Sequence, residues 1–137
     1  MRLTTHVTGP ASVELAWERY ADPALWSTWA PQIRTVRIHE GDPGRIHVGM
    51  RGTVHALFGL SVRFEVTDVD EAARTWWWTV HPPGLTLHLG HTIEPRPDGR
   101  TRTGLIIDGP APVVLTYAPV ARLALHRLLA VDRVDSA

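Results

Sequence analysis

Between residues 50 and 108, segments in which apolar and polar residues alternate are separated by short turn sequences. A period of two is typical of strands that bury one face, and clusters of Gly, Pro, Asn and Asp between such segments predict hairpins. The turns are Gly59-Leu60, Pro82-Pro83-Gly84 and Pro97-Asp98-Gly99-Arg100. This region is therefore predicted to form antiparallel strands at residues 50–58, 61–68, 74–81, 85–94 and 101–108.

The preceding residues are predicted to form two further strands with two helices between them. Alternation predicts a strand at residues 3–7 and another at residues 33–40. A helix is expected over residues 11–20, where apolar residues recur at helical spacing after Pro10, and a short second helix over residues 24–29.

An apolar stripe predicts a C-terminal helix over residues 120–131. Its start is left open: the helix begins at Pro119, or near Pro112 with a kink at Pro119, in which case Tyr117 joins the stripe. The complete pattern predicts an α+β fold, a single domain over residues 1–137. In it, a seven-stranded curved antiparallel sheet surrounds the C-terminal helix and a hydrophobic cavity, with two short helices after the first strand.

Composition excludes several classes of function. A chain of 137 residues with 44% hydrophobic and 20% charged residues is typical of one globular domain. Its 14 basic residues balance 14 acidic ones, so neither nucleic acid nor an anionic membrane is an expected partner. The chain has no lysine for a Schiff base and no cysteine for a thiol nucleophile or a disulfide.

The sequence also bears on location. The first residues contain no apolar signal core, and no segment approaches the roughly twenty apolar residues of a membrane span. We therefore expect a cytoplasmic protein without membrane insertion.

A two-residue hairpin at Gly59-Leu60 would set the register of the strands beside it. It pairs Leu57 with Val62, His55 with Phe64, and Thr53 with Val66. The face that carries Leu57, Phe64 and Val66 is apolar, so it is predicted to face the core, and it takes His55 and Thr53 with it.

The hairpin at Pro82-Pro83-Gly84 sets a second register. It is predicted to pair Val80 with Leu85, Trp78 with Leu87, and Trp76 with Leu89, all on the inner face. The same alternation places His91 inside and Trp77 outside. An outward Trp77 implies either a covering protein surface or a wrong register, so a homodimer is left open. The facing of residues 101–108, and so of Asp108, is left open as well.

The order of elements and several local motifs together resemble a known superfamily. The motifs are Gly9-Pro10-Ala11-Ser12-Val13 with Trp17, the segment Ala21 to Pro31 with its Asp-Pro and two tryptophans, Asp98 to Arg102, and Gly109. They resemble the START-like, helix-grip superfamily called SRPBCC, and within it the polyketide cyclase/dehydrase type. The resemblance implies the fold more strongly than an activity, because such proteins include lipid carriers, hormone receptors and aromatase/cyclases.

Residues expected on the inner face are the candidate ligand contacts. Trp76 and Trp78 could stack on a planar ligand, although packing in the core is an equal alternative. The full set of predicted ligand-binding residues is Thr53, Leu57, Phe64, Trp76, Trp78, Leu87, Leu89 and Ala121.

His55, His91 and Tyr117 are the candidate catalytic residues. A buried histidine could act as a general acid or base, and Tyr117 could donate a hydrogen bond to a ligand carbonyl. A structural role for each histidine is the alternative. No metal site is expected, since His88 and His91 point to opposite faces of one strand, and no cofactor is predicted.

Two functions follow with nearly equal support. In the first, the protein binds a small hydrophobic metabolite and acts on it as a cofactor-free cyclase or dehydratase through histidine acid-base catalysis. In the second, it is a non-catalytic carrier or sensor of lipid-like or aromatic molecules. A protein-interaction module is a third alternative. Converging polar groups in the cavity wall would favour catalysis, whereas an apolar wall would favour carriage.

Overall fold

The computed structural model describes residues 1–131 and shows seven strands, three α-helices and two short 3₁₀ turns. In chain order these are β1 (Arg2–Gly9), α1 (Val13–Ala21), η1 (Pro23–Leu25), α2 (Trp26–Trp29), β2 (Ile33–Glu40), β3 (Arg51–Ala56), η2 (Leu57–Gly59), β4 (Ser61–Asp70), β5 (Thr75–His81), β6 (Leu87–Pro95), β7 (Thr101–Asp108) and α3 (Ala111–Leu128).

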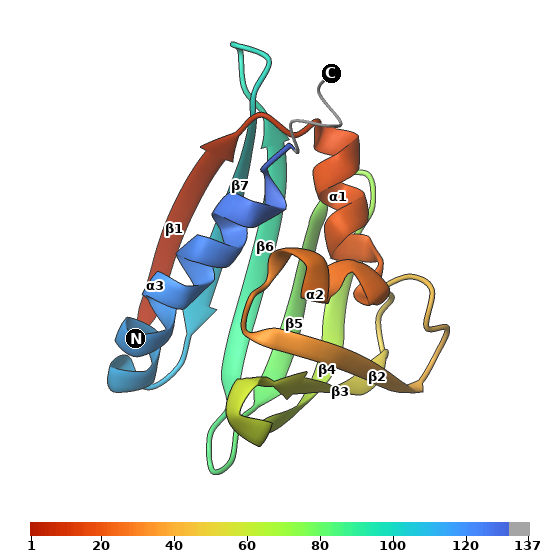
Figure 1. Ribbon diagram of the computed structural model, residues 1–137, viewed down its shortest axis with the longest axis vertical. Coiled ribbons are helices and arrows are strands. Elements are labelled where there is room, and N and C mark those ends of the chain that lie inside the picture. The colour runs from red at the N-terminus through yellow and green to blue at the C-terminus, as the bar shows by residue number, and fades with distance from the viewer. Residues whose placement is uncertain (132–137) are drawn as a thin grey trace.

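All seven strands form one antiparallel sheet in the order β1-β7-β6-β5-β4-β3-β2. Figure 1 shows α3 in front of β7 and β6, with α1 and α2 beside it in front of the next strands of the curved sheet. The predicted helix-grip fold is confirmed. None of the helices within residues 1–131 is long and apolar enough to span a membrane.

The short helices begin at side-chain caps. Ser12 Oγ accepts a hydrogen bond from the amide of Leu15 at 3.1 Å and starts α1. Asp22 Oδ1 accepts from the amide of Ala24 at 3.0 Å, and Pro23 occupies the first position of η1. These caps fix the direction in which α2 leaves α1. This direction places the tryptophans of α2 against the sheet.

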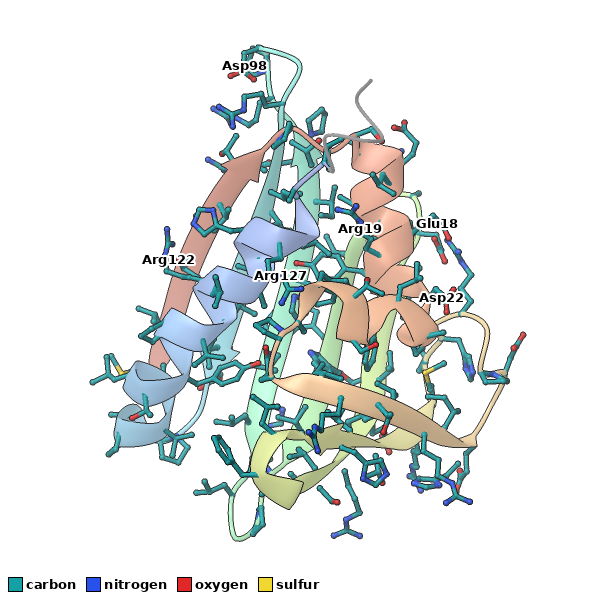
Figure 2. The ribbon with its side chains drawn as sticks, viewed as in Figure 1. Glu18, Arg19, Asp22, Asp98, Arg122 and Arg127 are labelled. Carbon is teal, nitrogen blue, oxygen red and sulfur yellow. The ribbon has the colours of Figure 1, made fainter. Side chains whose placement is uncertain are left out.

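Arginine side chains attach the C-terminal half of α3 to the other helices. Arg19 on α1 donates to the carbonyl oxygens of Leu128 and Ala130, at 2.6 and 2.7 Å. Arg127 donates to the carbonyl oxygen of Thr28 at 3.3 Å, and Figure 2 shows both arginines between α3 and the α1–α2 segment. The buried Leu128 belongs to the core at this end.

The start of α3 resolves the alternative that the sequence left open. The helix begins at Ala111 and includes Pro119, so Tyr117 lies on its inner side, as the second alternative predicted. It ends at Leu128, three residues before the predicted end at Val131.

The predicted pairing of β3 with β4 is wrong. Val54, not Leu57, lies opposite Val62, and Thr53 and His55 lie opposite Arg63 and Ser61. The strand stops at Ala56 because residues 57–59 form a 3₁₀ turn. Relative to the prediction, the register of β3 is shifted by an odd number of residues. Because side chains alternate along a strand, such a shift turns each of them to the other face.

The predicted pairing of β5 with β6 is wrong by two residues, yet its faces are right. Val80 lies opposite Leu87, Trp78 opposite Leu89, and Trp76 opposite His91. The strand β6 begins at Leu87 after a longer turn than predicted. Because side chains alternate with a period of two, an even shift keeps all of them on the predicted face.

The outer face of the sheet shows what covers Trp77 and which way Asp108 points. Trp77 faces outward, as predicted, and its ring lies against Gly90, where a β-carbon would approach the indole to 2.6 Å. The guanidinium of Arg2 lies 6.0 Å from the Trp77 ring centroid. On β7, Leu105 and Ile107 are buried, whereas Asp108 faces outward and pairs with Arg2 at 3.1 Å.

Candidate functional site

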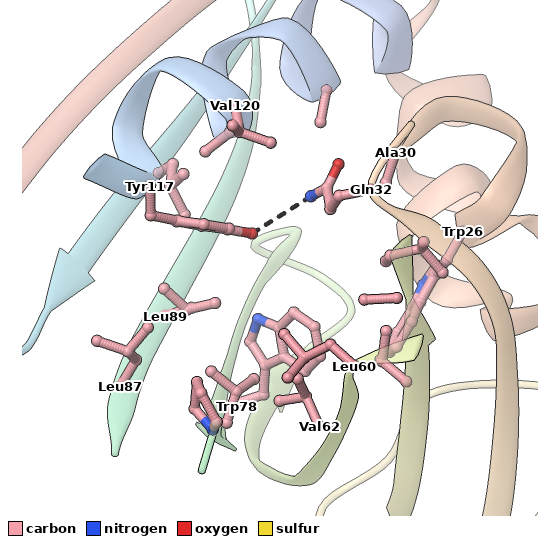
Figure 3. A pocket seen from close by; sticks show the side chains of 18 of the residues that line it. Trp26, Ala30, Gln32, Leu60, Val62, Trp78, Leu87, Leu89, Tyr117 and Val120 are labelled. Atoms are coloured by element: carbon pink, nitrogen blue, oxygen red, sulfur yellow. Dashed lines mark hydrogen bonds between the residues drawn. The ribbon is translucent and has the colours of Figure 1, made fainter. Parts of the chain in front are cut away.

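A cavity of about 420 Å³ lies between the sheet, α2 and α3. This volume is within the range of about 300–1,000 Å³ that is typical of small-molecule sites. Figure 3 shows Leu87, Leu89 and Trp78 of the sheet on one side, with Tyr117 and Val120 of α3 and Trp26 of α2 around them.

Most of the predicted ligand-binding residues line this cavity. They are Leu57, Trp76, Trp78, Leu87, Leu89 and Ala121. The remaining two do not. Thr53 is on the outer face, where its hydroxyl is 2.8 Å from Nε2 of His39, because the β3 register differs from the predicted one. Phe64 is buried outside the cavity lining, with its ring centroid 5.5 Å from those of Trp26 and Trp78.

The predicted catalytic residues are separated. His91 and Tyr117 line the cavity, but His55 does not. Its imidazole lies on the outer face, with Nδ1 3.3 Å from the Ser61 hydroxyl. The expected inward position of His55 is therefore wrong, for the same odd shift in register, and the two histidines do not approach one ligand.

His91 is held in the wall by two tryptophans. Its ring stacks on Trp76, with centroids 4.7 Å apart and planes at 14°. Trp78 Nε1 donates to His91 Nε2 at 3.0 Å, so Nδ1 of the neutral ring carries the hydrogen. Burial lowers the pKa of His91 to about 3. The imidazole is thus neutral at physiological pH, and its one lone pair is occupied.

Tyr20 closes the aromatic cluster behind His91. Their ring centroids are 4.8 Å apart. Thr103 donates to the carbonyl oxygen of Thr92 at 2.9 Å, so the Tyr20 hydroxyl must donate to Thr103 Oγ1, at 2.6 Å. Burial raises the pKa of Tyr20, which keeps this hydroxyl protonated. The Tyr20 hydroxyl therefore uses its hydrogen within the core and has none to donate to a ligand.

Tyr117 and Gln32 form a second polar site in the cavity wall, separate from His91. Gln32 Nε2 donates to the Tyr117 hydroxyl oxygen at 3.4 Å, the dashed line in Figure 3. Burial raises the pKa of Tyr117. Sequence reasoning missed Gln32, since it lies in a connection between α2 and β2 where no periodicity assigns a facing. Its position directly after Pro31 and before an apolar strand was the one available indication.

The rest of the wall is apolar. Besides Gln32, His91, Tyr117 and the indole N–H groups, the lining side chains within residues 1–131 carry no polar group, and none is an Asp, Glu or Arg. In the same part of the chain, no three His, Asp or Glu side chains come together as metal ligands.

The rim of the cavity includes the η2 turn. Leu57 and Leu60 are partly exposed, and Phe58 is fully exposed. Phe58 adopts a φ of 63°, a left-handed conformation that is uncommon for a residue with a bulky side chain. This conformation directs the chain back into β4 and leaves the phenyl ring in solvent at the rim.

No curated protein matches the chain. Many solved structures share its fold, among them a protein from Nitrosospira multiformis, at 19% identity and a TM-score of 0.78 over 94% of each chain. A hypothetical protein from Helicobacter pylori has 14% identity and a TM-score of 0.78, covering 94% of this chain and 86% of the other. Ara h 8.0201 has 17% identity and a TM-score of 0.73, covering 93% of this chain and 94% of the other.

These identities are low, so the three structures support the fold alone. A match to a protein family is stronger evidence than these structural similarities. Residues 1–131 match the family described as "Polyketide cyclase / dehydrase and lipid transport". The match spans the strands, the short helices and α3, and thus every element that forms the cavity wall. The chain therefore belongs to this family of polyketide cyclase, dehydrase and lipid-transport proteins, whose fold binds hydrophobic ligands.

Proposed function

We propose that the protein binds and holds a small, mainly apolar molecule as a carrier or sensor, without changing it. The observation that supports this function is the cavity of about 420 Å³ whose wall is apolar except at isolated points. Transfer of apolar surface from water into such a cavity is favourable by roughly 25 cal/mol per Å². Hydrophobic burial alone can therefore supply the affinity.

The wall offers little for acid-base catalysis. His91 cannot accept a proton while Nε2 is bonded to Trp78, and its pKa of about 3 keeps it neutral. An efficient general base needs a pKa near the working pH and a free lone pair directed at the substrate. His55 lies on the outer face. Histidine-based cyclisation or dehydration, the first of the two expected functions, is thus the less supported one.

One observation favours the enzymatic alternative. The Tyr117 hydroxyl lies in the cavity wall and could stabilise negative charge that develops on a ligand oxygen. In the described part of the chain, the unpaired donors of the wall, which also include Trp76 Nε1 and His91 Nδ1, do not complete a cyclase or dehydratase site without a base. The alternative therefore predicts a second reacting group on the ligand itself.

The test is the fate of the molecule that copurifies with the protein. Native mass spectrometry of the purified chain should show one small molecule per protein, and the released molecule should have an unchanged mass after incubation with fresh protein. Loss of water from it, or a new isomer on chromatography, would instead establish the enzymatic alternative.

A matched pair of variants on α3 locates binding. Ala121→Trp should fill the cavity and abolish copurification, because Ala121 lines it. Leu123→Trp should leave binding intact, because Leu123 lies on the exposed side of the same helix. Equal binding by both variants would show that the ligand site is elsewhere.

A further inference from the structure

We infer that the cavity selects uncharged molecules that carry a hydroxyl group, and that Tyr117 and Gln32 bind this hydroxyl together. The inference rests on the proposed function and adds the chemical class of the ligand. It follows from three properties of the wall formed by residues 1–131: its lack of charged side chains, one uncommitted hydrogen on Tyr117, and one unpaired acceptor, Gln32 Oε1. The other unpaired atoms of this wall, Trp76 Nε1 and His91 Nδ1, are donors.

Within residues 1–131, the wall contains no group that could neutralise an ionised ligand. No Arg, Asp or Glu within residues 1–131 lines the cavity, and His91 is neutral. The two arginines of α3 are directed elsewhere, Arg122 to Thr5 and the carbonyl oxygen of His6, and Arg127 to the carbonyl oxygen of Thr28. A carboxylate in this cavity would lose its hydration without gaining a partner, at a cost of several kcal/mol.

Tyr117 has a hydrogen to donate. Its oxygen accepts from Gln32 Nε2, and no acceptor for its own hydrogen is found among residues 1–131. Burial raises the pKa of Tyr117, so the phenol stays protonated and remains a donor throughout the physiological range. A ligand oxygen beside it would satisfy this donor, which a hydrocarbon cannot do.

Gln32 supplies the complementary acceptor. Its Oε1 is buried and has no hydrogen-bond partner within the described residues, and the same amide is already bonded to Tyr117. A ligand hydroxyl is the simplest group that both accepts from Tyr117 and donates to Gln32. A ketone or ester oxygen would satisfy only the first of these bonds. An unmade bond of a buried polar group costs roughly 1–3 kcal/mol, so the hydroxyl is favoured.

Three probes with one carbon skeleton test this selectivity. Naphthol, naphthalene and naphthoate are each titrated into the protein at neutral pH in a calorimeter. We expect naphthol to bind about tenfold more tightly than naphthalene, the factor that one net hydrogen bond provides. Naphthoate should bind at least about tenfold more weakly than naphthalene, and lowering the pH until it is protonated should restore its binding.

Variants then assign the effect to the two residues. Tyr117→Phe and Gln32→Met should each reduce the preference for naphthol over naphthalene, and naphthalene should bind at least as tightly as to the unchanged protein, because the unpaired polar groups are gone. That second readout also shows that the variants are folded. Thr116→Val is the matched control, since the Thr116 hydroxyl donates to the carbonyl oxygen of Pro112 on the exposed side of α3, and it should keep the full preference.

The outcomes are distinguishable. Equal affinity for naphthol and naphthalene, or tight binding of naphthoate at neutral pH, would overturn the inference and leave the proposed binding function intact. A preference for naphthol that survives in Tyr117→Phe would overturn the assigned site. Failure of all three probes to bind would contradict the proposed function and the inference together.

Discussion

Trp78 Nε1 donates a hydrogen bond to Nε2 of His91 across neighbouring strands, at 3.0 Å. The bond selects the tautomer with hydrogen on Nδ1 and places an uncharged imidazole against the Trp76 ring. A histidine in this position contributes an aromatic surface to the cavity rather than a titrating group.

The first prediction concerns pH and stability. The pKa of His91 is about 3 in the folded protein, well below its ordinary value of about 6.5. As pH falls below about 6.5, the unfolded chain binds a proton at this residue and the folded chain does not. The free energy of unfolding should therefore decrease with falling pH, at up to about 1.4 kcal/mol per pH unit from this residue.

The comparison with His91→Gln isolates this contribution. Glutamine keeps an acceptor for Trp78 but does not titrate, so the difference in unfolding free energy between the two proteins should shrink between about pH 7 and about pH 5. Urea unfolding at several pH values measures it. A pH-independent difference would mean that His91 titrates normally in the folded state.

The second prediction concerns the tryptophans. Trp78 lines the cavity and Trp77 lies on the outer face, so a bound apolar probe should quench the fluorescence of the first and not of the second. Trp78→Phe should weaken probe binding by about 1 kcal/mol and reduce the quenching, because ring area and the bond to His91 are lost. Trp77→Phe is the control and should preserve both affinity and quenching.

The third prediction concerns the outer face. Gly90→Ala should destabilise the protein by about 1–3 kcal/mol, because the new β-carbon would lie 2.6 Å from the Trp77 ring. In a Trp77→Ala background the same change should cost much less. A double-mutant cycle by urea unfolding should therefore give a clear coupling between the two sites. Additive effects would show that the clash is relieved in another way.

The sequence predicted the fold well because its strongest patterns are local. Alternation and turns located each strand, and the helical spacing of apolar residues after Pro10 located α1. The inner face of β5 and β6 was predicted correctly even with the wrong pairing, since the error was two residues. Trp76, Trp78 and His91 were therefore placed correctly.

The errors on β3 have one physical origin. Nothing in the local pattern shows that residues 57–59 leave the strand and form a turn, with Phe58 at a positive φ. That single change gives an odd shift in register, which moves His55 and Thr53 outside. Gln32 could not be placed either, because its position depends on how α2 meets β2 and not on any periodic pattern.

Pro119 divides α3 into two mechanically different parts. Proline has no amide hydrogen, so the helix lacks the bond that the Leu115 carbonyl oxygen would accept. The part after Pro119 is attached through Arg19 and Arg127 and supplies most of the α3 residues that line the cavity, whereas the part before it contributes Val113 and Tyr117. Because this bond is missing, we expect Pro119 to act as a hinge at which the first part moves outward to admit a ligand while the second part stays docked.

This hinge has a measurable consequence in hydrogen exchange. Amides of residues 113–118 should exchange faster than those of residues 121–128 in the empty protein, because the first part opens without unfolding the core. Bound naphthalene should slow exchange more in the first part than in the second, because both parts line the cavity but only the first is expected to open. Equal exchange in the two parts would show that α3 opens as a unit. Faster exchange in the first part would mean that one wall of the cavity opens for ligand exchange while the rest of the fold keeps its stability.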